Sequence, residues 1–143
     1  MRPRSDASQR IVNWHDQHYA NGVAKNQRTS QRFKRAARIL KRLRDDMKSQ
    51  GSSTAKTAAE NATSFLLESL AYNVSDGDYE HTEIYDVMRA VVASSWRATK
   101  EDASEKLVEV SELKWLFANS QAWTKSGTDS FLLAAWQHVA FKN

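Results

Sequence analysis

Residues 29–44 read Thr-Ser-Gln-Arg-Phe-Lys-Arg-Ala-Ala-Arg-Ile-Leu-Lys-Arg-Leu-Arg, a segment that interleaves basic and apolar side chains. Its apolar residues recur at intervals of three and four, which is the spacing of one face of an α-helix. They are Phe33, Ala36, Ala37, Leu40 and Leu43, and Met47 continues the series. With Thr29 as the N-cap and Gly51 as the break, the pattern predicts a long helix over residues 30–49.

The same spacing recurs further along the chain and predicts helices over residues 64–74, 82–98, 112–119 and 128–141. One proline and four glycines in the whole sequence also favour helices over a turn-rich β fold. Residues 8–14 have a short apolar centre that predicts a strand, and the turn signal Asn21-Gly22 predicts a loop over residues 15–28. We therefore expect a mostly α protein, a bundle of about five helices with a short N-terminal strand-like segment.

Length and composition set the class of protein. The 143 residues are enough for one ordinary domain, and no run of about twenty apolar residues could span a membrane. No apolar segment follows Met1, so no secretory signal is visible, and the lack of cysteine excludes disulfides and cysteine-based metal sites. These features predict a cytoplasmic protein that does not insert into a membrane.

The positive charge is concentrated in one element. Residues 25–48 contain ten Lys or Arg against two Asp, a net charge of +8, whereas the rest of the chain sums to −4. An anionic partner should therefore be sought at this helix. One hypothesis is a stand-alone basic module that binds RNA or DNA in a salt-sensitive way through the arginines of the helix, namely Arg32, Arg35, Arg38 and Arg42.

Three blocks of sequence point to a known family. The first runs from His18-Tyr19-Ala20-Asn21-Gly22 through Lys25-Asn26 and Thr29 to Phe33-Lys34 and Arg38-Ile39-Leu40-Lys41. The second is Thr63-Ser64-Phe65-Leu66-Leu67-Glu68, and the third joins Leu116-Phe117, Ala122-Trp123 and Phe131-Leu132-x-x-Ala135-Trp136. In this order they resemble the C-terminal helical domain of cGAS/DncV-like nucleotidyltransferases. The family usually has prolines where this chain has His15 and Thr63, and another near Ser75.

The resemblance implies a function for three residues. Lys41 corresponds to the long-helix lysine that contacts the triphosphate of a bound nucleotide, and Ser64 corresponds to the serine that hydrogen-bonds it. Phe65 corresponds to the aromatic residue that stacks on the nucleobase. The physical chemistry is consistent with these roles, because a lysine charge and a hydroxyl at a helix start both favour a polyphosphate. The implied ligand is an NTP, such as ATP.

The resemblance also implies what this sequence lacks. The family's catalytic half carries a Gly-Ser turn, an Asp-x-Asp pair and a third carboxylate, which hold two Mg²⁺ ions in the parent enzyme. Two short segments match these motifs by residue type alone, namely Gly51-Ser52 and Asp76-Gly77-Asp78. However, a predicted helix separates them and the aspartates lie in a predicted loop, which does not fit a two-metal site. We therefore assign no catalytic residue and no bound metal to this chain, and expect it to be inactive alone. The parent would join NTPs into cyclic or short linear oligonucleotides used as defence signals.

The remaining polar residues and the N-terminal segment have simpler interpretations. His15, Asp16 and His18 lack a third ligand at suitable spacing, so a metal site is disfavoured. Glu68 is expected to form a structural ion pair with the basic helix. Residues 1–28 are interpreted as a junction to the catalytic half, and residues 29–143 as the nucleotide-binding lobe. The apolar residues Ile11, Val12 and Trp14 should then contact either the missing half or a second copy of the chain.

Overall fold

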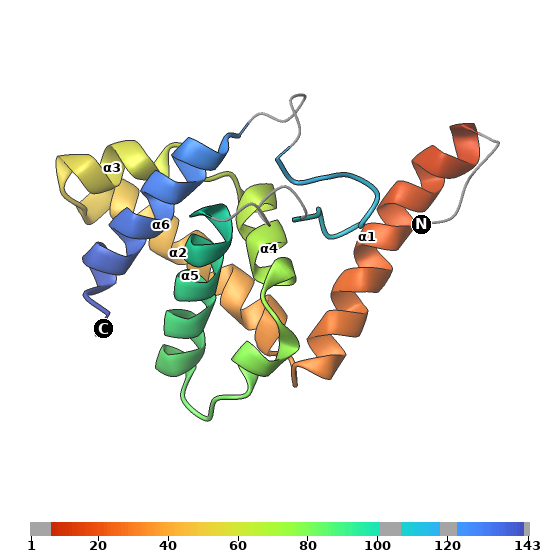
Figure 1. Cartoon of the computed structure of the whole chain (residues 1–143), viewed down its shortest axis with the longest axis horizontal. Coiled ribbons are helices and arrows are strands. Elements are labelled where there is room, and N and C mark those ends of the chain that lie inside the picture. Colours follow the sequence, from red (N-terminus) through yellow and green to blue (C-terminus); the bar gives the residue numbers. More distant parts are fainter. Residues whose placement is uncertain (1–6, 101–106, 118–122, 142–143) are drawn as a thin grey trace.

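The structure, a computed structural model, describes residues 7–100, 107–117 and 123–141. In that part of the chain six α-helices and one short 3₁₀ helix follow one another (Figure 1). They are α1 (Ala7–Arg28), α2 (Arg32–Gln50), α3 (Ser53–Ala59), α4 (Ser64–Asn73), η1 (Asp76–Tyr79), α5 (Ile84–Lys100) and α6 (Lys125–Val139). The predicted mostly α class is confirmed, since the described residues contain one isolated β-bridge and no strand.

Helix α2 lies at the centre of the bundle and contacts α1, α3, α4, α5 and α6. Its buried face contributes Phe33 and Leu40 to a core that also contains Leu66 of α4, Val91 of α5 and Phe131 of α6. The helices predicted over residues 30–49, 64–74, 82–98 and 128–141 match α2, α4, α5 and α6, with small shifts at their ends. Each of these segments buries apolar residues spaced three or four apart.

Helix α1 corrects the prediction for the N-terminal segment. The strand predicted over residues 8–14 and the loop predicted over residues 15–28 are both wrong, because Ala7–Arg28 forms one helix of 22 residues. The turn signal Asn21-Gly22 fails for a tertiary reason. Gly22 is buried, a Cβ added to it would lie about 3.8 Å from Phe33 of α2, and the Asn21 side chain donates to the Val110 carbonyl. The side chains of Ile11, Val12 and Trp14 lie outside what the structure describes.

The segment 107–117 corrects a second prediction. The helix predicted over residues 112–119 is wrong for residues 112–117, which form turns closed by the Val108–Trp115 bridge; residues 118 and 119 lie outside the described part. The cause is a pair of hydrogen bonds between Asn73 and Val108, which are distant in sequence and which we call the Asn73–Val108 clasp. Asn73 of α4 donates to the Val108 carbonyl and accepts from the Val108 N–H, while Glu112 takes a left-handed conformation with φ of 61°. Leu116 is nevertheless buried.

Helix α3 was not predicted, because its sequence is polar and alanine-rich. Ser52 caps it by accepting the N–H of Ala55, and the small buried side chains Ala55, Ala58 and Ala59 allow α3 to pack against α2 and α6. Gly51 makes the turn from α2 possible, since a Cβ at this position would lie 2.5 Å from the Met47 carbonyl oxygen.

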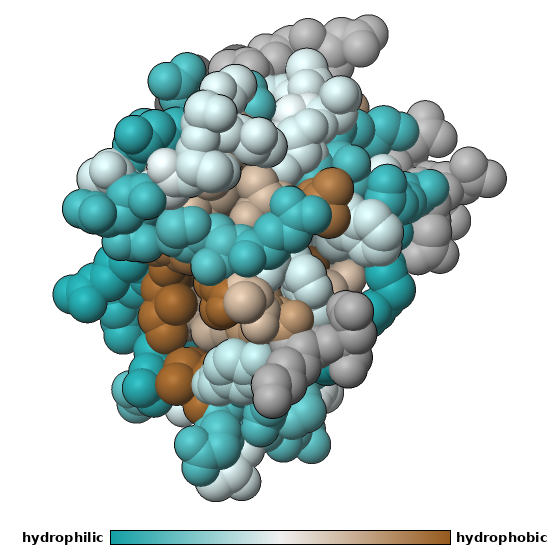
Figure 2. Space-filling model, turned by 90° about the vertical axis from the view of Figure 1, so that its left-hand side faces the viewer, coloured by the Kyte–Doolittle hydropathy of each residue, from teal (hydrophilic) through white to brown (hydrophobic). Residues whose placement is uncertain are grey.

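The surface has a mixed character. Seen from the left of Figure 1, hydrophobic side chains gather in one part of the face and hydrophilic ones surround them (Figure 2). Within the described residues, none of the helices combines the length and apolar character needed to cross a bilayer.

Candidate functional site

The edge where α2 and α4 meet brings Lys41 and Ser64 together. Arg44 of α2 donates from Nη1 to the Ser64 hydroxyl at 3.1 Å and to the Ala62 carbonyl at 3.0 Å. One turn away, Lys41 Nζ lies 3.9 Å from Glu68 Oε1 of α4. Because residues three or four apart in a helix share a face, these two cross-links place the Lys41 amine and the Ser64 hydroxyl on the same edge. We call this edge, formed by Lys41, Arg44, Ser64 and Glu68, the α2/α4 edge.

Ser64 occupies the first position of α4, and its hydroxyl does not cap the helix. The N-cap is Thr63, whose side chain accepts the N–H of Leu66 at 3.1 Å. Ser64 is exposed and its hydroxyl oxygen accepts a hydrogen bond from Arg44. The hydroxyl therefore lies at the positive end of a ten-residue helix, where the first backbone N–H groups point toward solvent or a ligand.

Lys41 is one-third exposed, and its ion pair with Glu68 is long. An ion pair of this length near the surface contributes little to stability, about 0–1 kcal/mol. The predicted pairing of Glu68 with the basic helix is confirmed, but its small energy leaves the Lys41 ammonium able to exchange Glu68 for a stronger anion. Glu68 would then be a negative charge close to that anion.

Phe65, the third predicted residue, belongs to a group of three rings. Its centroid lies 5.7 Å from the His18 ring at an interplanar angle of 25°, and 5.6 Å from the Trp123 ring at 30°. Trp123 is held in turn by its indole N–H, which donates to the Leu116 carbonyl at 2.7 Å. Phe65 is half-buried, so its side chain is neither fully within the core nor fully exposed.

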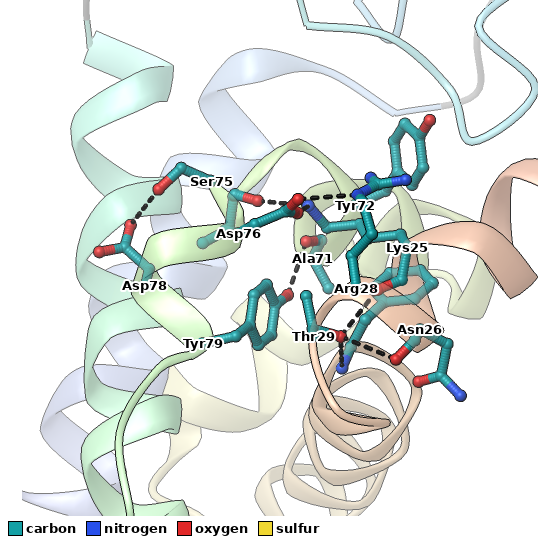
Figure 3. Close-up of polar contacts among 12 residues, drawn as sticks. Lys25, Asn26, Arg28, Thr29, Ala71, Tyr72, Ser75, Asp76, Asp78 and Tyr79 are labelled. Atoms are coloured by element: carbon teal, nitrogen blue, oxygen red, sulfur yellow. Dashed lines mark hydrogen bonds and ion pairs between the residues drawn. The ribbon is translucent and has the colours of Figure 1, made fainter.

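The Lys-Asn and Thr of the first sequence block build a junction between α1 and α2 (Figure 3). Lys25 is 4% exposed and donates at 2.7 Å both to the Val74 carbonyl and to Asp76 Oδ1. Asn26 Oδ1 accepts the N–H of Lys34, and Thr29 Oγ1 accepts the N–H of Phe33. The prediction that Thr29 is the N-cap is wrong, because the helix begins at Arg32 and its N-cap is the left-handed Gln31, whose side chain makes no capping hydrogen bond. Thr29 nevertheless accepts the Phe33 N–H in the first turn of α2. Lys25, Asn26 and Thr29 are thus explained by structure and are not part of the α2/α4 edge.

Asp76 closes this junction from the other side. Arg28 Nε lies 2.8 Å from Asp76 Oδ2, and this hydrogen bond, followed by that from Lys25, lowers the pKa of the Asp76 carboxyl below its usual range. Burial raises the pKa of the neighbouring Tyr79, whose hydroxyl donates to the Ala71 carbonyl. The pKa of Tyr72 is likewise raised, mainly by burial and secondly by the hydrogen bond that its hydroxyl donates to Glu112. Each of these groups thus has a structural function.

The arginines of the alternative hypothesis lie on the outer side of α2. Arg35, Arg38 and Arg42 are exposed and form no ion pair within the described part of the chain, whereas Arg32 is half-buried. Positions 35, 38 and 42 share one helical face, opposite the buried Phe33 and Leu40. This face adjoins Lys41 but is separate from the hydroxyl of Ser64.

The carboxylates present do not fit a two-metal centre. Asp76 is occupied by Lys25 and Arg28, and Asp78 accepts from Ser75 and Ser94. In the residues that the structure describes, no three His, Asp or Glu side chains come close enough to hold a metal ion. We therefore derive no catalytic step from these residues.

Sequence reasoning missed Arg44, which holds Ser64 in place. Its side chain is only 13% exposed and bridges α2 to the α3–α4 connection, while its Nε contacts Asp45 at 3.0 Å. The available signal was its position three residues after Lys41, on the same side of the helix. Among ten basic residues in residues 25–48, that signal did not distinguish it.

Comparison with known proteins identifies the family of this chain. The sequence model of the "cGAS/DncV-like nucleotidyltransferase C-terminal helical domain" matches residues 20–140. The chain is 35% identical, over 95% of its length, to a cyclic dipyrimidine nucleotide synthase, CdnE, of Legionella pneumophila, and 34% identical, over 92%, to one of Cecembia lonarensis. It spans 44% of the length of each of these relatives.

A solved structure has the same fold. The Elizabethkingia meningoseptica CdnE cyclic dinucleotide synthase, determined with GTP and Apcpp, aligns with a TM-score of 0.79 and 28% sequence identity. The alignment covers 88% of this chain and 44% of that one.

Proposed function

Because this chain belongs to the family of C-terminal helical domains of cGAS/DncV-like nucleotidyltransferases, we propose that it forms the nucleotide-binding lobe of a cyclic nucleotide synthase. The parent enzyme would join NTPs into cyclic or short linear oligonucleotides, using Mg²⁺ ions held by residues outside this chain. The observation that carries the proposal is the convergence of Lys41 and Ser64 on the α2/α4 edge.

Each residue of the α2/α4 edge has a distinct part in binding a triphosphate. Lys41 supplies a positive charge, and the Ser64 hydroxyl lies at the positive dipole end of α4, which favours an anion. Arg44 is a positioning residue, because its two hydrogen bonds to Ala62 and Ser64 fix the start of α4 against α2. The lobe binds and orients the polyphosphate and carries out no chemistry on it.

Phe65 supports the nucleobase end of the same proposal. It follows Ser64 directly, so a triphosphate at the start of α4 places the attached nucleoside within reach of the ring group of His18, Phe65 and Trp123. Aromatic stacking recognises any base, since every base has a π face. The lobe therefore contributes affinity for nucleotides without selecting among them.

The test is a titration of the ¹⁵N-labelled chain with ATP, followed by NMR. We expect saturable shifts at the amides of residues 63–66, and a five- to tenfold weaker affinity in Lys41→Ala and in Ser64→Ala, about 1–1.4 kcal/mol. Lys48→Ala is the matched control, because Lys48 is exposed on the same helix and carries the same charge. Equal loss in Lys48→Ala would show a general charge effect and contradict the proposal.

The alternative function, nucleic-acid binding, is favoured by the three exposed arginines on the outer face of α2. It is tested with a DNA and an RNA duplex at several salt concentrations. Under this alternative, Arg38→Ala and Arg42→Ala weaken duplex binding and each lowers the salt dependence by about 0.9 in the logarithmic slope. If Lys41→Ala weakens ATP binding and leaves duplex binding unchanged, the result favours the nucleotide-binding lobe over the nucleic-acid module.

We also propose that α1 carries the surface toward the catalytic half of the parent enzyme. The helix extends to one side of the bundle (Figure 1), and its Tyr19 is 70% exposed. A second copy of the chain would be the other occupant of this surface. Light scattering of the chain and of Tyr19→Ser distinguishes them: a dimer that the substitution disrupts indicates self-association, and a monomer indicates a surface reserved for the other half.

A further inference from the structure

A groove between α5 and α6 is unrelated to the α2/α4 edge. It has a volume of about 600 Å³, within the range of small-molecule sites, and its floor is formed by the buried Val92 and Leu132. Its walls include Trp96 of α5 and Trp136 of α6, both half-buried. The two helices lie side by side, on the opposite side of the bundle from α1 (Figure 1).

The side chains of the groove favour an aromatic ligand. Two indole rings on facing helices, above an aliphatic floor, offer flat surfaces on which a planar ring stacks. The Trp96 indole N–H is buried and has no hydrogen-bond acceptor in the described part of the chain.

The charges of the groove favour an anion. Arg89 and Arg97 line it, and the Arg89 guanidinium lies 5.5 Å from the centre of the Trp136 ring. Lys100 lies over Trp96 at 4.6 Å and is partly neutralised by Asp129, 3.2 Å away. No acidic side chain lines the groove among the described residues. Guanidinium groups pair with carboxylates and phosphates through two parallel hydrogen bonds.

We infer that this groove is a second ligand site, which binds a planar aromatic ring bearing a carboxylate or a phosphate group. The ring lies between Trp96 and Trp136, and the anionic group pairs with Arg97 and Arg89 at the rim. The site does not depend on the proposed nucleotide function, since it shares no residue with the α2/α4 edge. Two sources share this chemistry, a nucleoside monophosphate and an aromatic carboxylate.

The experiment follows the tryptophan indole N–H signals of the ¹⁵N-labelled chain during titration with three probes. AMP and 2-naphthoate represent the two sources, and 2-naphthol is the uncharged control. We expect saturable shifts of the Trp96 and Trp136 signals with at least one anionic probe, and at least tenfold weaker binding of 2-naphthol. The anionic probe that binds identifies the source.

Variants assign the binding to the groove. Arg97→Gln should weaken the bound anion at least fivefold, and Arg89→Gln should do the same. Arg42→Gln, which changes an exposed arginine on α2, should leave the affinity unchanged. Arg97 is exposed, so Arg97→Gln decides the question even if Arg89→Gln fails to fold. Unmoved Trp96 and Trp136 signals at millimolar probe, full affinity in Arg97→Gln, or equal binding of 2-naphthol would each overturn the inference.

Discussion

Removing Asp76 should destabilise the protein more than removing Lys25, although the two form one ion pair. The Lys25 side chain is 5% exposed, whereas that of Asp76 is 39% exposed and also contacts Arg28. In Asp76→Ala the Lys25 ammonium stays buried, and the partners it keeps among the described residues are the Val74 carbonyl and two aromatic rings. In Lys25→Met the Asp76 carboxylate keeps Arg28 and water. The penalty of an unpaired buried charge therefore applies to only one variant.

The magnitudes follow from that difference. Breaking a buried pair so that one charge stays buried costs about 3–5 kcal/mol, which we expect for Asp76→Ala. Lys25→Met loses the hydrogen bond to the Val74 carbonyl and a partly screened ion pair, about 1–2 kcal/mol. With a urea m-value of about 2 kcal/mol/M, the unfolding midpoint should fall by about 1.5–2.5 M and about 0.5–1 M, respectively.

Urea unfolding at pH 7 measures both values, and the double variant Lys25→Met/Asp76→Ala should be more stable than Asp76→Ala alone. Glu80→Ala is the matched control, since Glu80 is exposed, follows η1 and forms no ion pair in the described part of the chain. A Lys25→Met variant at least as unstable as Asp76→Ala would refute the reasoning. Hydrogen exchange adds a structural readout, because loss of the pair should expose the amides at the C-terminal end of α1 first.

Three further predictions concern pH, capping and the α2/α4 edge. The pKa of Asp76 is lower in the folded state than in the unfolded state, where it is about 3.9. The stabilisation by the ionised carboxylate is therefore present above that pH and is lost as the pH falls through the folded pKa. The difference in unfolding free energy between wild type and Asp76→Asn should shrink when unfolding is measured at successively lower pH. Thr63→Ala removes the cap on the Leu66 N–H and should cost about 1 kcal/mol in thermal unfolding, whereas Thr63→Ser should cost little. Glu68→Gln removes a negative charge beside Lys41 and should strengthen ATP binding, measured by calorimetry, about two- to fivefold, which corresponds to about 0.4–1 kcal/mol of binding free energy. A weaker affinity would contradict the assignment of the α2/α4 edge as the phosphate site.

The parts of the fold that could be predicted are those held by apolar periodicity. Helices α2, α4, α5 and α6 bury residues at intervals of three and four, so they can be predicted from the local sequence alone. Helix α1 contacts the bundle through Asn21 and Lys25, whose partners Val110 and Asp76 are distant in sequence. Polar contacts of this kind leave no periodic trace, and the same is true of the clasp between Asn73 and Val108.

The candidate site could be predicted in part. Family resemblance indicated Lys41 and Ser64, and the structure brings them to one edge; their roles in binding stay predictions. Arg44 could not be singled out, because its function depends on where the α3–α4 connection crosses α2, and α3 itself was not predicted. The motif Lys25-Asn26 is instead explained as a helix junction, so a shared family motif need not mark a ligand contact.

The ring group limits what Phe65 contributes to binding. Its ring already contacts His18 and Trp123, and each such aromatic contact is worth about 0.5–1.5 kcal/mol. A base that stacks on Phe65 is worth about 1–3 kcal/mol by itself, but it must replace or share one of these contacts. The net gain is therefore the difference between two similar energies. Trp123 is held by its hydrogen bond to the Leu116 carbonyl, so a base that stacked on Phe65 would have to fit beside a Trp123 ring that keeps its place.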